Sequence, residues 1–248
     1  MDKEFWQARW DEGRIGFHQE EINPYLRRYW QRLACESKAT VFVPLCGKSK
    51  DMLWLREQGH TVIGVERVAR AVADFFAEND IPCETYPKDA FTVWKGEGIT
   101  IYCGDFFELG AQDLADVAGV YDRGSLIALP PERRGRYADH LRAILPRRAD
   151  VLLITLDYPQ AEMQGPPFAV DEREVAGTWN GSSGKAEPEL RRRPAEADRS
   201  VYERARSVWH RAVSAYPEVF SAGRAQFPTD VTGVARIVDI LEPIELAR

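Results

Sequence analysis

The sequence is poor in cysteine and histidine, and neither residue type is clustered. Its 248 residues include four cysteines and four histidines. The cysteines are Cys35, Cys46, Cys83 and Cys103, too far apart for a CxxC redox pair or a metal knuckle. We therefore expect no metal site, and we interpret the cysteines as reduced core or near-core thiols of a cytoplasmic protein.

The sequence also lacks long apolar runs and an excess of basic residues. No run approaches the ~18 apolar residues of a membrane span, and the first residues lack the basic and apolar regions of a signal peptide. Lys and Arg total 33 against 39 Asp and Glu, a net charge of −6 that suits phosphate-backbone binding poorly. We therefore expect neither a membrane nor a nucleic acid as a partner, and we expect a monomer.

Glycine-rich phosphate-binding motifs are a third absence. Gly47-Lys48-Ser49 resembles the end of a P-loop, but position 42, where that motif needs glycine, is Phe42. Residues 45–50 contain one glycine, whereas a dinucleotide site needs G-x-G-x-x-G. The first mismatch excludes a nucleoside-triphosphate site, and the second argues against a dehydrogenase.

Short apolar runs alternate with amphipathic segments over residues 1–156, which is the pattern of a parallel sheet with helices on both faces. We expect strands at 40–43, 61–65, 117–121 and 151–156, and a hairpin from 91–94 and 99–102. We expect helices at 4–10, from Asn23-Pro24 onward, from Gly47 to Gln58, at 68–78 and at 131–145. The sequence therefore predicts an α/β fold with a doubly wound, mostly parallel sheet.

Residues at the predicted carboxyl ends of the strands form a candidate nucleotide site, because ligands bind there in such sheets. Gly47 lets the backbone approach a ligand. Glu66 follows 19 residues later, the spacing of an acid that accepts hydrogen bonds from ribose hydroxyls. Asp105 is placed to recognise an adenine amino group, and Phe106 beside it offers a ring face. Alone, each has an ordinary explanation as a turn glycine, an exposed charge or a cap; at consecutive strand ends they are harder to explain that way.

Seven segments, taken together and in this order, resemble the thiopurine S-methyltransferase family. They are EFWQARW (4–10), IGFHQ (15–19), VPLCGKS (43–49), GH-x-V-x-GVE (59–66), YCGDFF (102–107), YDRGSL (121–126) and GPPF (165–168). The resemblance implies a class I, Rossmann-like methyltransferase fold, with S-adenosylmethionine as the methyl donor. It implies small aromatic or heterocyclic thiols as acceptors and, as in bacterial members, selenium or tellurium species.

The resemblance also implies roles for individual residues. The donor-binding set that it implies is Trp10, Leu45, Glu66 and Arg123. Gly47, in the turn after the predicted strand 40–43, belongs to the same set. Asp105 and Phe106 would flank the adenine. Phe17, and with it His18, would line the acceptor side.

Arg123 and His18 keep alternative interpretations when the residues are considered alone. The Arg123 guanidinium suits a donor carboxylate or a ring nitrogen of the acceptor, but it could instead pair with Asp122 or Glu66. His18 could be a hydrogen-bonded loop histidine. We assign no catalytic base, because heterocyclic thiols are acidic enough to be largely ionised near neutral pH.

The resemblance ends near residue 175. We expect residues 1–176 to form the methyltransferase domain and residues 177–248 a divergent C-terminal region, either the end of that domain or a poorly packed tail. Within it, 196–216 predicts an amphipathic helix and 236–246 a strand. A divergent tail and a shifted reading frame in the gene both remain open. So do two other functions, an inactive or binding-only methyltransferase-like protein and a Rossmann-like dehydrogenase.

Overall fold

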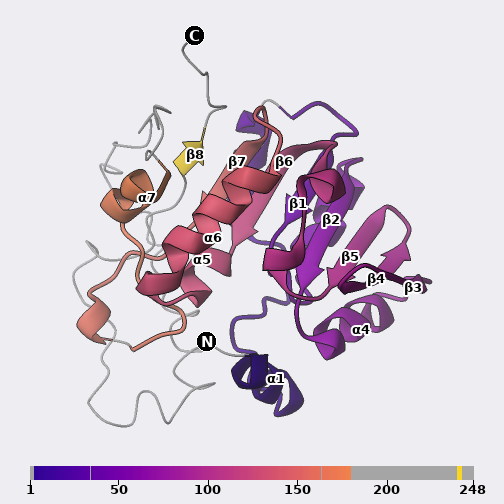
Figure 1. Ribbon diagram of the computed structural model, residues 1–248, viewed down its shortest axis with the longest axis horizontal. Helices are drawn as coiled ribbons and strands as arrows, with labels where there is room; N and C mark the ends of the chain where they lie inside the picture. The colour runs from indigo at the N-terminus through magenta and orange to yellow at the C-terminus, as the bar shows by residue number, and fades with distance from the viewer. Residues whose placement is uncertain (1–2, 34, 163, 180–238, 242–248) are drawn as a thin grey trace.

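One mixed sheet organises the chain (Figure 1), which the computed structural model describes at residues 3–33, 35–162, 164–179 and 239–241. Its eight strands have the order β3-β4-β5-β2-β1-β6-β7-β8. They are β1 (Thr40–Val43), β2 (Thr61–Glu66), β3 (Glu84–Lys88), β4 (Phe91–Gly96), β5 (Ile99–Cys103), β6 (Val117–Arg123), β7 (Asp150–Ile154) and β8 (Asp239–Leu241). Neighbours from β5 to β7 are parallel, whereas β3, β4 and β8 join antiparallel. The predicted doubly wound, mostly parallel sheet is confirmed.

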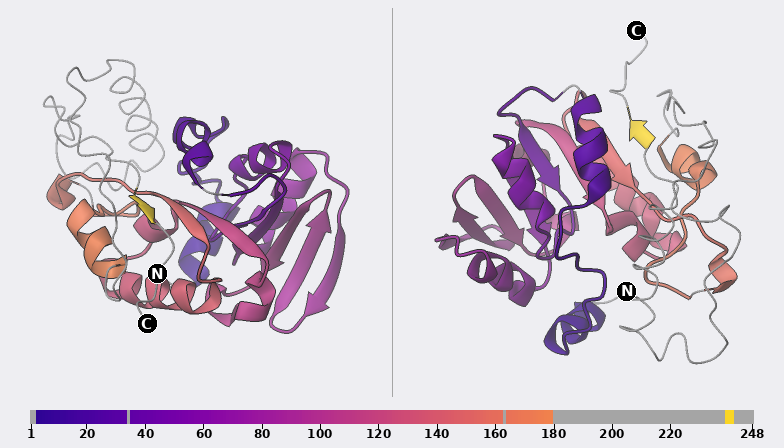
Figure 2. Two further views of the ribbon diagram at one scale, coloured as in Figure 1. Left: turned by 90° about the horizontal axis from the view of Figure 1, so that it is seen from above. Right: turned by 180° about the vertical axis from the view of Figure 1, so that it is seen from behind.

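Helices cover both faces of the sheet (Figure 2). They are α1 (Lys3–Asp11), α2 (Pro24–Tyr29), α3 (Asp51–Glu57), α4 (Ala69–Glu78), α5 (Ser125–Ala128), α6 (Pro131–Ile144) and α7 (Glu172–Trp179), with 3-10 turns at Trp30–Arg32, Phe106–Glu108, Ala111–Leu114 and Gln160–Glu162. Leu26 of α2, Met52 of α3 and Phe75 of α4 share one buried cluster. Tyr137 and Leu141 of α6 belong to another. The two clusters lie on opposite faces, with α6 on one and α2, α3 and α4 on the other.

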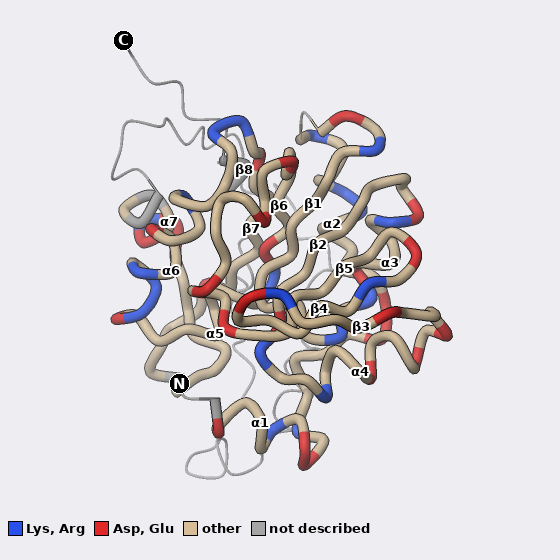
Figure 3. The backbone as a smooth tube through the Cα atoms, turned by 45° about the vertical axis from the view of Figure 1, so that its right-hand side comes forward, with Lys and Arg blue, Asp and Glu red and all other residues tan. Residues whose placement is uncertain are grey.

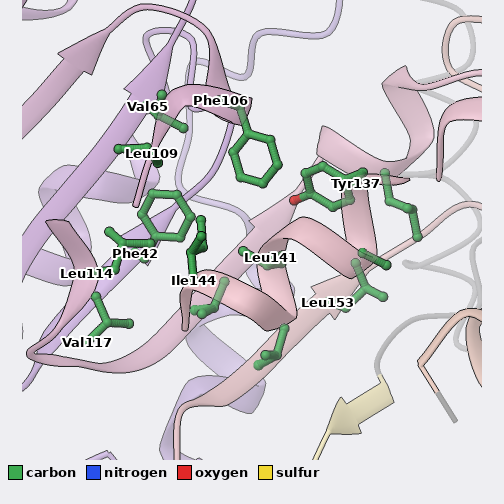
Figure 4. Packing of buried hydrophobic residues seen from close by; sticks show 14 of the residues in the cluster. Phe42, Val65, Phe106, Leu109, Leu114, Val117, Tyr137, Leu141, Ile144 and Leu153 are labelled. Atoms are coloured by element: carbon green, nitrogen blue, oxygen red, sulfur yellow. The ribbon is translucent and has the colours of Figure 1, made fainter. Parts of the chain in front are cut away.

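The central strands send their side chains alternately into these two clusters. In β7, Val151 and Leu153 face the α6 cluster, whereas Leu152 and Ile154 face the opposite one. Figure 4 shows the α6 cluster, with Leu153 near the helix that covers it. Because both faces are buried, these strands are continuous apolar runs, which is why the sequence pattern identifies them.

β3 is the strand that the sequence analysis missed. Its residues are exposed except for the half-buried Lys88, and Pro87 lies within it. It forms one edge of the sheet, where proline and charged side chains are tolerated. A strand of this kind has no apolar alternation to detect. Cys83, expected in or near the core, is exposed just before β3.

The C-terminal region is described only in part. β8 lies inside the predicted strand 236–246 and runs antiparallel to β7, with Ile240 opposite Leu152. The predicted helix at 196–216 lies outside the described residues. Within the part of the chain that is described, no helix has the length and the apolar character needed to cross a membrane.

Charged residues lie mainly on the helices and loops around the sheet (Figure 3), where several pair locally. Lys48 Nζ lies 2.6 Å from Glu78 Oε1, and Lys50 Nζ lies 2.9 Å from Glu20 Oε2. Both lysines closely follow Gly47. The two pairs therefore link the turn after β1 to α4 and to the loop before α2, although exposed pairs contribute little stability.

Candidate functional site

The carboxyl ends of four neighbouring strands meet at one edge of the sheet. The strands β5, β2, β1 and β6 are adjacent and parallel, so the segments that follow them lie side by side. These segments carry Gly47, Glu66, Asp105 and Arg123. The structure therefore brings together the residues that the sequence placed at separate strand ends.

Glu66 is held by backbone N–H groups on both sides. Its Oε2 accepts a hydrogen bond from the N–H of Gly47 at 2.9 Å, and its Oε1 accepts one from the N–H of Val68 at 2.8 Å. Burial raises the pKa of Glu66, whereas these hydrogen bonds oppose that rise. The backbone of Arg67 also hydrogen-bonds this carboxylate, and an ionised carboxylate has about four acceptor positions, so about one remains for a ligand hydroxyl.

The turn after β1 packs against an aromatic residue of α1. Leu45 and Gly47 both have left-handed backbone conformations, with φ of 43° and 53°. A Cβ at position 47 would lie 3.2 Å from Cζ2 of Trp10, closer than most real contacts. Glycine is therefore required there on two grounds, its backbone angle and the approach of Trp10.

Phe17 and His18 lie on the loop that follows α1. The Phe17 ring is 36% exposed and meets Trp10 edge to face, with ring centroids 5.6 Å apart. The His18 side chain is buried, and its Nε2 lies 3.6 Å from Glu20 Oε1. Burial, and then the nearby charge of Lys48, lower the pKa of His18, so its imidazole is neutral at pH 7. An exposed ring therefore packs against Trp10, and the residue that follows it in the chain carries a neutral imidazole.

Arg123 connects three parts of the site. Its Nη1 donates to the backbone oxygen of Phe17 at 3.2 Å. Its Nη2 donates to Ser49 Oγ at 3.2 Å and to Asp51 Oδ2 at 3.3 Å. The guanidinium at the end of β6 is thus tied both to the loop carrying Phe17 and to the start of α3.

The two ion pairs that the sequence left open for Arg123, with Asp122 or with Glu66, are not the ones that the structure shows. Glu66 is engaged by backbone N–H groups, and Asp122 accepts a hydrogen bond from the Tyr137 hydroxyl at 2.7 Å. The partner is Asp51, which the sequence analysis did not single out. Its only sequence signal is an acid in the first turn of the helix after the Gly47 turn, an ordinary position for an acid.

Asp105 and Phe106 occupy the end of β5 in different ways. Asp105 accepts a hydrogen bond from the N–H of Phe107 at 3.1 Å, and its other oxygen pairs with Arg67 at 3.0 Å. The Phe106 ring is 3% exposed and packs against Tyr137, as Figure 4 shows, with centroids 4.9 Å apart. The expectation that this ring offers a face to adenine is therefore wrong, because the ring is in the core. The Asp105 side chain, by contrast, is 36% exposed and stays accessible.

The family pattern described as Thiopurine S-methyltransferase (TPMT) matches residues 1–209. The chain belongs to this family. It is 56% identical over 179 residues to the thiopurine S-methyltransferase of Nitrosospira multiformis, a match that covers 72% of this chain and 81% of that protein. It is 52% identical over 181 residues to the enzyme of the same name from Pseudomonas aeruginosa, covering 73% and 83%. The resemblance found in the sequence motifs is thus confirmed.

Solved structures of other methyltransferases share the fold of this family member. An S-adenosylmethionine-dependent methyltransferase from Anabaena variabilis superimposes with a TM-score of 0.54 at 14% identity, covering 72% of this chain and 80% of that one. The 1,6-didemethyltoxoflavin-N1-methyltransferase of Burkholderia thailandensis, solved with 1,6-didemethyltoxoflavin and S-adenosylhomocysteine, gives 0.51 at 19% identity, covering 72% and 74%. At these identities the similarity shows the class I methyltransferase fold that the sequence predicted.

Proposed function

We propose that this chain transfers the methyl group of S-adenosylmethionine to the sulfur of thiopurines and related small aromatic or heterocyclic thiols. Family membership and the names of the bacterial relatives support this activity. The structural observation that carries it is the Glu66 carboxylate, fixed 2.9 Å from the Gly47 N–H where the parallel strands end. An acid at this place is suited to ribose hydroxyls.

The residues on the donor side fit the parts of S-adenosylmethionine. Glu66 keeps acceptor capacity for a ribose hydroxyl. Gly47 has no Cβ, so the turn after β1 can lie directly against the Trp10 ring, which brings this ring next to the backbone that the donor would meet. Arg123 provides a fixed positive charge for the donor carboxylate. Asp105, at the end of β5, lies where the adenine would follow from the ribose.

Bound S-adenosylmethionine supplies a methyl group that its sulfonium charge makes electrophilic. The part of the protein is to align the acceptor with that methyl group and to keep water away. Phe17 presents an exposed ring face on the acceptor side, and the neutral His18 lies next to it. No base is assigned, because the acceptor thiol ionises unaided. Selenium and tellurium species belong to the same proposal, since they are soft nucleophiles like sulfur.

We assign this activity to a unit of residues 1–176 acting as a monomer in the cytoplasm. All the site residues lie within that range, and Phe17 contacts both Trp10 and Arg123 inside one chain. The four cysteines are free thiols, which is consistent with a reducing compartment.

Two measurements test the proposed function. First, S-adenosylhomocysteine should raise the melting temperature, since ligand at about 100 times its Kd stabilises the folded state by about 2.7 kcal/mol. Second, the protein should methylate 6-mercaptopurine on sulfur with S-adenosylmethionine as donor. Binding without turnover would favour the binding-only alternative. Stabilisation by NADH instead of S-adenosylhomocysteine would favour a dehydrogenase.

A further inference from the structure

Asp51 is a buried carboxylate with no role in the binding of donor and acceptor proposed above. Its side chain is 1% exposed, at the first residue of α3. Oδ1 accepts a hydrogen bond from the backbone N–H of Asn23 at 2.8 Å. Oδ2 accepts one from the hydroxyl of Tyr121 at 2.9 Å. A buried carboxylate is tolerated only with such partners, so each of them constrains where the carboxylate lies.

The same oxygen that accepts from Tyr121 also faces Arg123. Arg123 Nη2 lies 3.3 Å from Asp51 Oδ2 and 3.2 Å from Ser49 Oγ, so that end of the guanidinium is fixed from two sides. Nη1 donates to the backbone oxygen of Phe17. Nε, by contrast, has no hydrogen-bond partner among the described residues. The orientation of the planar group is therefore set by Asp51, Ser49 and the Phe17 carbonyl, and Asp51 is the charged member of these three.

Arg123 and Tyr121 keep their protonation states around neutral pH. Burial lowers the pKa of Arg123, but the carboxylate of Asp51 and the contact with Tyr121 raise it by more than burial lowers it. The net pKa is therefore raised, and the guanidinium stays charged. Burial and the charge of Asp51 raise the pKa of Tyr121 well above its usual value. Its hydroxyl therefore remains a donor to Asp51 across the working pH range.

Asp51 also holds the chain segment that leads to the acceptor side. Its partner Asn23 caps α2, with the Asn23 side chain accepting from the N–H of Tyr25 at 2.9 Å. The loop that ends at Asn23 is the loop that carries Phe17 and His18. One carboxylate thus binds both the end of this loop and the guanidinium that reaches across to its middle.

We propose that Asp51 is a positioning residue that fixes Arg123 and the Phe17 loop relative to each other, and that it touches neither the donor nor the acceptor. The proposal rests on the proposed function, because Arg123 is taken to bind the donor. Tyr121 has the same role one step further out, since its hydroxyl orients the Asp51 oxygen that Arg123 contacts.

A double-mutant cycle tests this assignment. Asp51→Asn keeps the shape and removes the charge, and it is combined with Arg123→Ala to give four proteins. The readouts are the Kd for S-adenosylhomocysteine and kcat/KM for methylation of 6-mercaptopurine. We expect Asp51→Asn to weaken both about tenfold, the scale of one charge-assisted hydrogen bond. In the Arg123→Ala background the same change should have an effect below about twofold, because the group through which Asp51 acts is gone.

Tyr121→Phe provides a second variant in case Asp51→Asn does not fold. It removes one hydroxyl and leaves the ion pair, and we expect a smaller loss that again disappears in the Arg123→Ala background. Asp113→Asn is the matched control, since Asp113 is also a buried carboxylate paired with a cation, Lys88, at 2.6 Å. It should lower the melting temperature and leave both readouts unchanged.

Three outcomes would contradict the proposal. Losses that add fully in the double variant would mean that Asp51 acts only through stability or by itself. An Arg123→Ala protein that binds and turns over normally would remove the group that Asp51 is said to position, while the proposed function would stand. A native protein that neither binds S-adenosylhomocysteine nor methylates a thiol would remove the proposed function, and this assignment with it.

Discussion

Replacing Glu66 by Gln tests the donor site, because the change removes a charge and keeps the shape of the side chain. Each carboxylate oxygen accepts one backbone N–H, from Gly47 at 2.9 Å and from Val68 at 2.8 Å. A glutamine has one oxygen for these two donors and turns its NH2 group toward the other. We therefore expect Glu66→Gln to lower both the stability of the fold and the affinity for the donor.

The sizes of the two losses follow from the kinds of hydrogen bond involved. One backbone N–H left unmatched in a buried place lowers the free energy of unfolding by about 1–3 kcal/mol. Hydrogen bonds from ribose hydroxyls to a charged acceptor contribute about 1.5–3 kcal/mol, and an amide oxygen retains part of that. Because about 1.4 kcal/mol is a tenfold change in Kd, we expect the Kd for S-adenosylhomocysteine to rise roughly 10- to 100-fold.

Calorimetric titration with S-adenosylhomocysteine measures the affinity, and a melting curve without ligand measures the stability. Glu78→Gln is the matched control, because it removes the same charge from an exposed pair with Lys48, the residue after Gly47. Its Kd should stay within about twofold of the native value. A Glu66→Gln protein with native affinity and a normal melting curve would refute the assignment of Glu66 to the ribose.

Three further predictions concern the turn, a buried histidine and the reaction. Gly47→Ala should lose about 1 kcal/mol or more of stability and bind S-adenosylhomocysteine more weakly, because φ is 53° and a Cβ would lie 3.2 Å from Trp10. The control is Gly135→Ala in α6, where a Cβ meets nothing within 4 Å and the stability should rise by about 0.5–1 kcal/mol. Equal melting temperatures of the two variants would contradict this prediction. Burial lowers the pKa of His60, whose Nε2 accepts the indole N–H of Trp30 at 3.0 Å. The unfolded chain therefore binds more protons than the folded one, and the free energy of unfolding measured with denaturant should fall as the pH drops below 6.5. A free energy that does not change with pH, or the same pH dependence in His60→Gln, would count against this prediction. Turnover should follow the ionised fraction of the acceptor thiol, and a pH limb that persists across acceptors of different pKa would reveal an enzyme base.

The fold was largely predictable because its central strands are buried on both faces. Such strands are short continuous apolar runs, and 40–43 and 151–154 stand out in the sequence for that reason. The edge strand β3 was not predictable, since an exposed strand with a proline has no apolar pattern. The observed strand β7 ends at Ile154, two residues before the end of the predicted strand 151–156, because the ends of strands have little local sequence signal.

The site was predictable where it depends on the chain order, and not where it depends on distant contacts. Glu66 follows from its spacing after Gly47, and both lie together in the structure. Asp51 did not follow, because its partner Tyr121 is 70 residues away, and nothing local marks the carboxylate as buried. The prediction for Phe106 was wrong because its position at a strand end indicated contact with a ligand, whereas its ring packs against Tyr137 in the core.

The left-handed turn at Leu45 limits how this protein can be made more heat resistant. A non-glycine residue with φ of 43° costs the fold about 1–2 kcal/mol. A selection for melting temperature alone would favour glycine at this position and would relieve that strain. It would also free the turn that places Gly47 against Trp10 and Glu66. Stabilisation and methyl-donor binding are therefore expected to compete at Leu45, so laboratory evolution of this chain needs selection on turnover at every round.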